Sequence, residues 1–266
     1  MKDIILLAAG QNTKMFPFDL CTPKHLRNVL GKPLIRYNIE SLRTFTDDPI
    51  HIMCLDDCRG MLADSLRDIS NIHIHTIDKT QGTSDTVLSA LPYVLSDSCV
   101  VLYADTYIEP QDLQRLYNAQ DITVLAFPCT TATNDAICLD IDNDTVTTIG
   151  AHLRNETFSY VFGGFHLTKS YEEELVCTPE FFPGMKVGQA APKERYIEAS
   201  LYNYRKNHPV RAIIGQHEFF DIDKPWDLYE LNLHVLKQTF AGISGNTLSP
   251  DSCIDPTAVI EGKLIM

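Results

Sequence analysis

Short apolar runs alternate with amphipathic stretches through the first half of the chain. The runs have the length of buried strands, about six residues, and cover 2–7, 50–55, 72–77, 99–104 and 122–127. The stretches between them place apolar residues at helical spacing, over 33–45, 57–68, 84–95 and 111–118. This alternation predicts an α/β fold of the Rossmann-like kind, with a mostly parallel sheet flanked by helices. Ligands of such sheets bind at the carboxyl ends of the strands.

The second half has a different pattern. Residues 136–166 are rich in strand-forming residues, and Asp142–Asp144 predicts the turn of a hairpin. A helix and further strands are expected after it, over 192–206, 209–213 and 217–222. Pro225 begins a closing helix, since proline fits the first helical turn. Because no low-complexity linker interrupts the sequence before residue 240, we expect residues 1–240 to form one domain.

The tail, residues 241–266, carries a six-residue apolar repeat. The repeated positions are Leu248, Ile254, Ile260 and Met266. This period is typical of a left-handed hexapeptide β-helix, of which the tail would form about one coil, whereas stacked repeats need about three to be stable. The tail is therefore predicted to be a docking coil or the start of a truncated β-helix. An ordinary C-terminal strand and turn is the alternative.

Charge and composition exclude several classes of function. The formal net charge is −13, from 22 Lys and Arg against 35 Asp and Glu, and no basic run occurs. This argues against nucleic-acid and anionic-membrane partners. No apolar run approaches the roughly 18 residues of a membrane span, and no signal peptide is recognisable. The 8 cysteines are scattered, which favours reduced thiols and a cytoplasmic location over disulfides or a zinc site.

The first candidate chemistry lies at the end of the first strand. The apolar run Ile4–Leu7 leads into Ala8, Ala9 and Gly10. Small residues let backbone N–H groups approach a phosphate closely. Lys14 and Lys24 add positive charge beside this loop. The combination predicts a cradle for a triphosphate.

This block resembles the signature of the sugar-1-phosphate nucleotidyltransferases, also called NDP-sugar pyrophosphorylases. Their opening runs leucine-alanine-alanine-glycine-x-glycine-threonine-arginine, then proline-lysine, then glycine-lysine-proline. The matching segments here are Leu7–Lys14, Pro23-Lys24 and Gly31-Lys32-Pro33. Asn12 replaces the second glycine, and Lys14 replaces the arginine, which keeps the charge but loses the bidentate fork. A generic strand–loop–helix is the alternative, and the two later motifs at family spacing disfavour it.

Two aspartates are candidate metal ligands. Asp105 directly follows the predicted strand 99–104, so it falls at the ligand edge of the sheet. Asp221 lies in Asp221–Leu228, a segment that resembles the family's aspartate-isoleucine-glycine-x-proline-x-aspartate-leucine. The resemblance implies that both carboxylates hold Mg²⁺. A helix or turn cap is the alternative for Asp105.

The resemblance also implies residues for the base and the sugar. Gln81, Gly82 and Thr83 match the base-recognition segment, with a helix N-cap as the alternative. Gly164 matches the glycine beside the hexose, and Glu198 is a candidate contact to a sugar hydroxyl. Residues 146–155 lack the family's glutamate-lysine-proline.

Together these motifs imply a Mg²⁺-dependent nucleotidyltransferase that makes an NDP-sugar and pyrophosphate from an NTP and a sugar 1-phosphate. In that reading, Leu7, Ala8, Ala9 and Gly10 bind the nucleotide, and Lys14 and Lys24 are catalytic. The resemblance favours UTP or dTTP. The sequence is compatible with a homo-oligomer. The alternatives are a catalytically quiet regulatory or scaffolding paralogue, and a transferase for a non-sugar phosphate such as phosphocholine.

Overall fold

The computed structural model describes most of the first 241 residues. These are 1–10, 15, 22–78, 80–129, 136–151, 157–171, 175 and 195–241, with the backbone of 186–187 and residues 257 and 259. Asn12, Lys14 and the repeated positions of the tail lie outside the described residues. Among the helices in the described ranges, none is long and apolar enough to cross a membrane.

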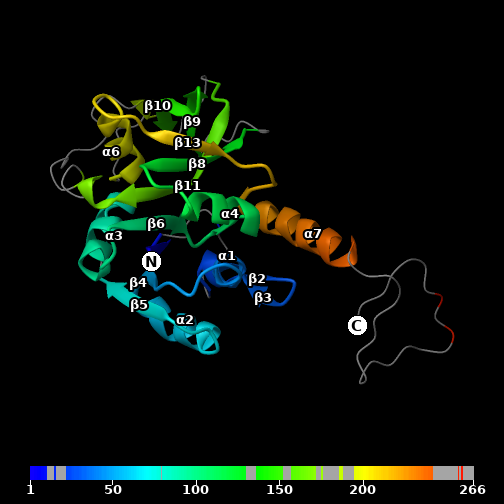
Figure 1. Ribbon diagram of the computed structural model, residues 1–266. Coiled ribbons are helices and arrows are strands. Elements are labelled where there is room, and N and C mark those ends of the chain that lie inside the picture. Colours follow the sequence, from blue (N-terminus) through cyan, green and yellow to red (C-terminus); the bar gives the residue numbers. More distant parts are fainter. Residues whose placement is uncertain are drawn as a thin grey trace.

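A 10-stranded sheet forms the centre of the molecule (Figure 1). Its strand order is β12-β10-β13-β8-β11-β6-β1-β4-β5, with β9 pairing to β10 and β11. The strands of the first half are β1 (Asp3–Ala8), β4 (Ile50–Leu55), β5 (Ile72–Ile77), β6 (Ser98–Tyr103) and β8 (Thr123–Pro128). Those of the second half are β9 (Ile137–Asp142), β10 (Thr145–Ala151), β11 (Tyr160–Thr168), β12 (Lys186–Val187) and β13 (Arg211–Ile214). Every strand predicted in the first half is confirmed within one or two residues.

The sheet is mixed, whereas the sequence predicted a mostly parallel one. The four strands β6, β1, β4 and β5 are parallel, but β11 runs antiparallel between β6 and β8. The difference begins at the β9–β10 hairpin, where Asn143 and Asp144 adopt positive φ angles of 47° and 57°. A tight hairpin can join only antiparallel strands, so the chain leaves the parallel alternation there.

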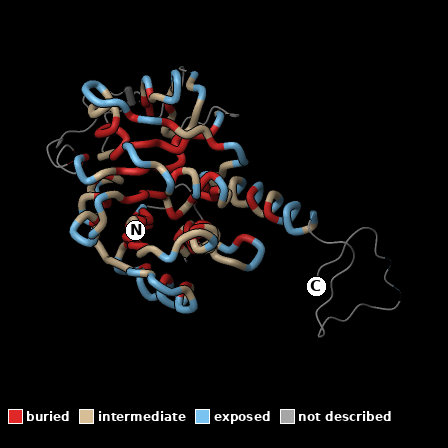
Figure 2. Tube along the Cα trace, viewed as in Figure 1, coloured by how far each residue is buried: buried red, intermediate tan, exposed pale blue. Residues whose placement is uncertain are grey.

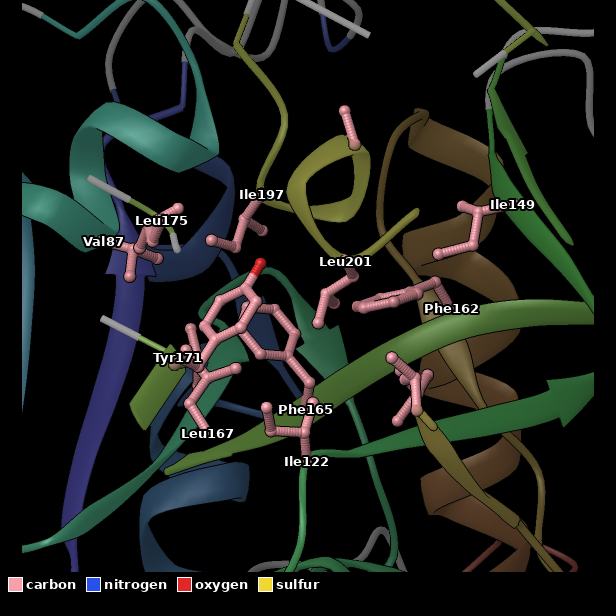
Figure 3. Packing of buried hydrophobic residues seen from close by; sticks show 14 of the residues in the cluster. Val87, Ile122, Ile149, Phe162, Phe165, Leu167, Tyr171, Leu175, Ile197 and Leu201 are labelled. Atoms are coloured by element: carbon pink, nitrogen blue, oxygen red, sulfur yellow. The ribbon is translucent and has the colours of Figure 1, made fainter. Parts of the chain in front are cut away.

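Helices cover both faces of the sheet. On one face lie α1 (Leu34–Arg43), α2 (Arg59–Leu66) and α4 (Pro110–Tyr117); on the other lie α3 (Thr83–Ala90) and α6 (Ile197–Tyr204). Side chains of β1 alternate between the two cores, with Ile4 and Leu6 facing α1 and Ile5 and Leu7 facing α3. Figure 2 shows the resulting band of buried residues along the sheet, and Figure 3 shows the core beneath α3 and α6. Burial on both faces explains why β1 is continuously apolar.

Two small sheets and a third core extend this body. β2 (Asn28–Val29) pairs with β3 (Lys32–Pro33), and β7 (Thr106–Tyr107) pairs with β14 (Phe220–Asp221). The closing helix α7 (Pro225–Ala241) buries Leu231 and Val235 in a cluster with Tyr107 and Ile222. The segment that carries Asp221 is thereby packed onto the segment that follows β6.

A buried carboxylate fixes the connection from β13 to β14. Asp112 of α4 is fully buried and accepts hydrogen bonds from the backbone N–H groups of Gln216 and His217, each at 3.1 Å. Its oxygens also lie 3.0 Å from Nδ1 of His217 and 3.1 Å from Arg115. Charge-assisted bonds of this kind are stronger than neutral ones. Asp112 therefore determines where the chain turns toward Asp221.

We expect Asp112→Ala to lower the free energy of unfolding by about 3 kcal/mol, because it removes the fully buried acceptor of the Gln216 and His217 N–H groups and the carboxylate partner of Arg115. Urea denaturation measures the change. Asp64→Ala, at an exposed position of α2, is the matched control and should change stability by less than about 0.5 kcal/mol. Equal effects of the two substitutions would contradict the anchoring role.

Candidate active site

Lys24 is surrounded by aspartates at one edge of the sheet. Its ammonium contacts Asp105 and lies 3.0 Å from Oδ1 of Asp223. The Lys24 side chain is only 12% exposed, and it begins a short 3-10 helix, Lys24–Leu26. Burial alone would lower the pKa of Lys24, but the carboxylates of Asp105, Asp221 and Asp223 outweigh it and raise that pKa. Lys24 is therefore a permanent cation within a cluster of aspartates.

The two predicted metal ligands meet through backbone pairing. Asp105 follows β6, and the next residue, Thr106, is the register partner of Asp221 in the β7–β14 ladder. The N–H of Ile222 donates to the carbonyl oxygen of Asp105 at 3.1 Å. Main-chain hydrogen bonds thus hold Asp105 and Asp221 next to each other, although they lie far apart in sequence.

A buried amide supports this arrangement from α1. Nδ2 of Asn38 donates to the carbonyl oxygen of Thr106 at 2.8 Å, and its Oδ1 accepts from the N–H of Ile108 at 3.1 Å. Asn38 is 1% exposed. The sequence alone does not single out Asn38 as a site residue. The available signal was a polar residue at a core-facing position of an amphipathic helix, between Ile35 and Ile39.

The donor set suits a hard cation that also takes ligands from a substrate. Carboxylate oxygens are the ligands that Mg²⁺ prefers, and Mg²⁺ usually keeps only one or two of them. In the part of the chain that the structure describes, no three His, Cys, Asp or Glu side chains are arranged to hold a metal by themselves. Asp105 and Asp221 therefore fit a metal that completes its shell with water and phosphate.

The predicted phosphate loop reaches the same edge. Leu7 is the register partner of Tyr103, and its carbonyl oxygen accepts from the N–H of Ala104 at 3.0 Å. Ala8 and Ala9 are buried, and Gly10 is exposed just beyond them. The end of β1 therefore lies beside the segment that carries Asp105. This is the arrangement that a phosphate between loop and carboxylates requires.

The predicted base segment is docked onto the start of α6. The N–H of Arg195 donates to the carbonyl oxygen of Gln81 at 2.7 Å, and the N–H of Ser84 donates to that of Arg195 at 3.0 Å. Gly82 adopts φ +141°, and a Cβ there would lie 2.3 Å from the carbonyl oxygen of Arg195. Only glycine allows this close approach of two backbones.

Glu198 lies beneath this junction. It has no exposed surface, and its carboxylate accepts from the hydroxyl of Tyr103 and, at 3.2 Å, from that of Thr83. The Thr83 Oγ1 atom also accepts from the N–H of Ile197 at 3.0 Å. Burial raises the pKa of Glu198. The carboxylate thus joins the base segment to the strand that precedes Asp105, using hydroxyl groups of the chain itself.

Gly164 lies one strand away, in β11 beside β6. A Cβ at this position would lie 2.8 Å from Leu102 Cδ2 and 3.0 Å from the Val101 carbonyl oxygen. Close packing of β11 on β6 is a structural reason for the glycine. The structure thus brings Lys24, Asp105 and Asp221 together. Gly164 lies next to them in the sheet, on β11, and Glu198 lies on helix α6.

We expect Gly82→Ala to lower the free energy of unfolding by about 2 kcal/mol or more, because the added Cβ forces the backbone of Arg195 away in a conformation that L residues avoid. Thermal or urea unfolding measures it. Gly60→Ala is the control, since Gly60 lies in α2 with open space around it; it should stabilise the protein by about 0.5–1 kcal/mol. Gly82→Ala without loss of stability would disprove the tight junction.

The sequence and the fold are similar to those of known proteins. Residues 4–158 match the family model described as MobA-like NTP transferase domain. The bifunctional protein GlmU of Pseudomonas fluorescens is 34% identical over 118 residues, which is 43% of this chain and 24% of that protein. GlmU of Methanococcus maripaludis is 24% identical over 268 residues, covering 99% of this chain and 61% of that protein. The chain thus spans less than two thirds of the length of these curated relatives.

Solved structures share the fold. The inositol-1-phosphate CTP transferase from T. maritima superposes with a TM-score of 0.71 at 18% identity, covering 92% of this chain and 98% of that one. A UDP-glucose pyrophosphorylase complexed with UDP-glucose superposes with a TM-score of 0.73 at 16% identity, covering 90% and 99%. At these identities, the likeness concerns the fold alone.

Proposed function

Because this chain belongs to the family of MobA-like NTP transferase domains, we propose that it is a nucleotidyltransferase that acts on an NTP and a sugar 1-phosphate. A phosphate oxygen of the sugar phosphate attacks the α-phosphorus in line, the bond from the α-phosphorus to the bridging oxygen breaks, and pyrophosphate leaves. The observation that carries the proposal is Lys24 held by Asp105 and Asp223 beside the end of β1. Catalysis of this transfer is mainly positioning and charge neutralisation.

Asp105 and Asp221 would hold Mg²⁺. When bound, the ion neutralises charge on the phosphates and makes the α-phosphorus more electrophilic. The support for this assignment is the main-chain pairing that keeps the two carboxylates adjacent. Lys24 would neutralise the α-phosphate or the incoming phosphate, since its raised pKa keeps it charged.

The remaining residues take roles around the nucleotide. The backbone of Leu7, Ala8, Ala9 and Gly10 would cradle the phosphates, and Lys14 would neutralise the leaving pyrophosphate. The segment Gln81, Gly82 and Thr83 would read the base edge. UTP or dTTP is the nucleotide we propose, in line with the UDP-glucose pyrophosphorylase complexed with UDP-glucose among the similar structures.

The sugar would lie beside Gly164 and Glu198. The buried carboxylate of Glu198 fixes the hydroxyl of Tyr103, whose ring lies 6.4 Å from that of Phe162 between centroids. These side chains would shape the sugar subsite from below. A transferase for a non-sugar phosphate is the second candidate, because residues 146–155 lack glutamate-lysine-proline and a similar fold carries inositol-1-phosphate chemistry.

A pyrophosphate-release assay tests the function directly. We expect release with Mg²⁺, UTP or dTTP and one sugar 1-phosphate, and its loss when EDTA removes the metal. The panel should include the other common nucleotides, inositol 1-phosphate and phosphocholine. Release only with a non-sugar phosphate would select the second candidate. Nucleotide binding by calorimetry without release from any pair would contradict catalysis and favour a regulatory subunit.

We expect Asp105→Asn and Asp221→Asn each to reduce kcat/KM at least about 100-fold, because each removes a negative charge from the proposed metal site. Steady-state pyrophosphate release measures the loss. Asp56→Asn, an exposed position next to α2, is the chemically matched control and should behave as wild type. Asp221→Asn should not lower the free energy of unfolding, since it relieves repulsion within the acidic cluster. Asp105→Asn weakens the contact with the buried ammonium of Lys24 and should lower it, so the kinetics are measured under conditions where urea unfolding shows each variant folded. Full activity of Asp105→Asn would refute the proposed mechanism.

A further inference from the structure

Helix α7 has two apolar stripes on opposite sides. The first stripe comprises Leu228, Leu231 and Val235 and packs into the cluster around Tyr107 and Ile222. The second, which we call the outer stripe, comprises Trp226, Tyr229, Leu233 and Leu236. Its side chains are 61%, 63%, 37% and 36% exposed, respectively. A helix that is apolar on two sides is typical of one buried between two partners, and the domain supplies one of them.

The outer stripe has the spacing of a coiled-coil seam. Trp226, Tyr229, Leu233 and Leu236 are separated by 3, 4 and 3 residues, and Phe240 continues the series after 4 more. Alternating steps of 3 and 4 are the a and d positions of a heptad. This spacing fits another helix as the partner, since it is the spacing with which two helices pack along a seam. Figure 1 shows α7 projecting from the body of the protein toward the C-terminal end.

Two opposite charges flank the outer stripe on one side. Taking Trp226 and Leu233 as a positions, Glu230 and Lys237 are both e positions, and both are exposed. In an antiparallel helix pair, e positions face e positions of the partner. A second copy of α7 would therefore place its Lys237 beside Glu230 and its Glu230 beside Lys237. The charges match only in this self-complementary arrangement, since in a parallel pair the e positions would face uncharged Asn232 and Thr239.

We propose that the outer stripe is a dimer interface at which α7 packs antiparallel against α7 of a second copy of this chain. Leu233 of one copy would pack against Leu236 of the other, with two symmetry-related Glu230–Lys237 ion pairs beside them. A single patch that binds itself about a two-fold axis gives a closed dimer. The formal net charge of −13 opposes association, so we expect the dimer to be weak and to depend on protein concentration. The inference does not rest on the proposed function.

Sedimentation velocity of the full chain over about 1 μM to about 1 mM, the range of weak association, tests the interface. We expect a reversible monomer–dimer equilibrium for the wild type. E230K and K237E should each weaken dimerisation about tenfold, because each turns two ion pairs into two like-charge contacts. The double variant E230K/K237E should restore the wild-type constant. Leu233→Gln, which keeps a good helix former at a half-exposed position, should weaken the dimer as well.

D64K on α2 is the control, since it changes the net charge by the same amount as E230K at an exposed position outside α7. It should leave the dimer unchanged. Urea unfolding shows whether each variant is folded. Three results would overturn the proposal: a wild type that stays monomeric throughout, single variants that dimerise as the wild type does, or a double variant that is not rescued. The last outcome would show that α7 does not pair in the antiparallel register.

Discussion

The contact between Lys24 and Asp105 is the interaction around which the candidate site is organised. Three carboxylates at one sheet edge repel one another, and a partly buried ammonium among them offsets that repulsion. The oxygen atoms of these carboxylates are also the candidate ligands of a metal ion. Lys24 therefore offsets part of the negative charge of the three aspartates. An anionic substrate that binds here would meet a lysine that is already charged and held in position.

The fold keeps this contact in register from several directions. The β7–β14 ladder aligns Asp221 with Thr106, Asn38 holds the turn from α1, and Asp112 fixes the chain on its way to β14. Asn38 and Asp112 are buried polar groups whose hydrogen bonds are made within the fold, and such groups are costly to displace. The edge that carries the carboxylates is thus more rigid than a surface loop would be. Rigidity of this kind is what positioning catalysis requires.

The sequence predicts the site residues that lie at the ends of strands. It does not predict the residues whose surroundings are formed by segments distant in sequence. Asp105 was predictable because a residue after a buried parallel strand falls at the ligand edge whatever the register. Its pairing with Asp221 required the family resemblance. The sequence suggests a contact to a sugar hydroxyl for Glu198, yet this residue is buried and its carboxylate bonds the hydroxyls of Tyr103 and Thr83, which are distant from it in sequence. The antiparallel position of β11 between β6 and β8 was not predicted for the same reason. The hydrophobic pattern of a strand does not show which strands it pairs with.

The position of Glu198 has a consequence for specificity. One carboxylate is bonded to Thr83 of the predicted base segment and to Tyr103, two residues before Asp105. A change at the start of α6 would therefore displace the predicted base segment and the strand before Asp105 together. Because the proposed sugar position is also beside Glu198, a substitution of this residue would affect the nucleotide side and the sugar side at once. The nucleotide motifs keep most of the family pattern, with departures at Asn12 and Lys14, and the glutamate-lysine-proline motif of the sugar side is absent.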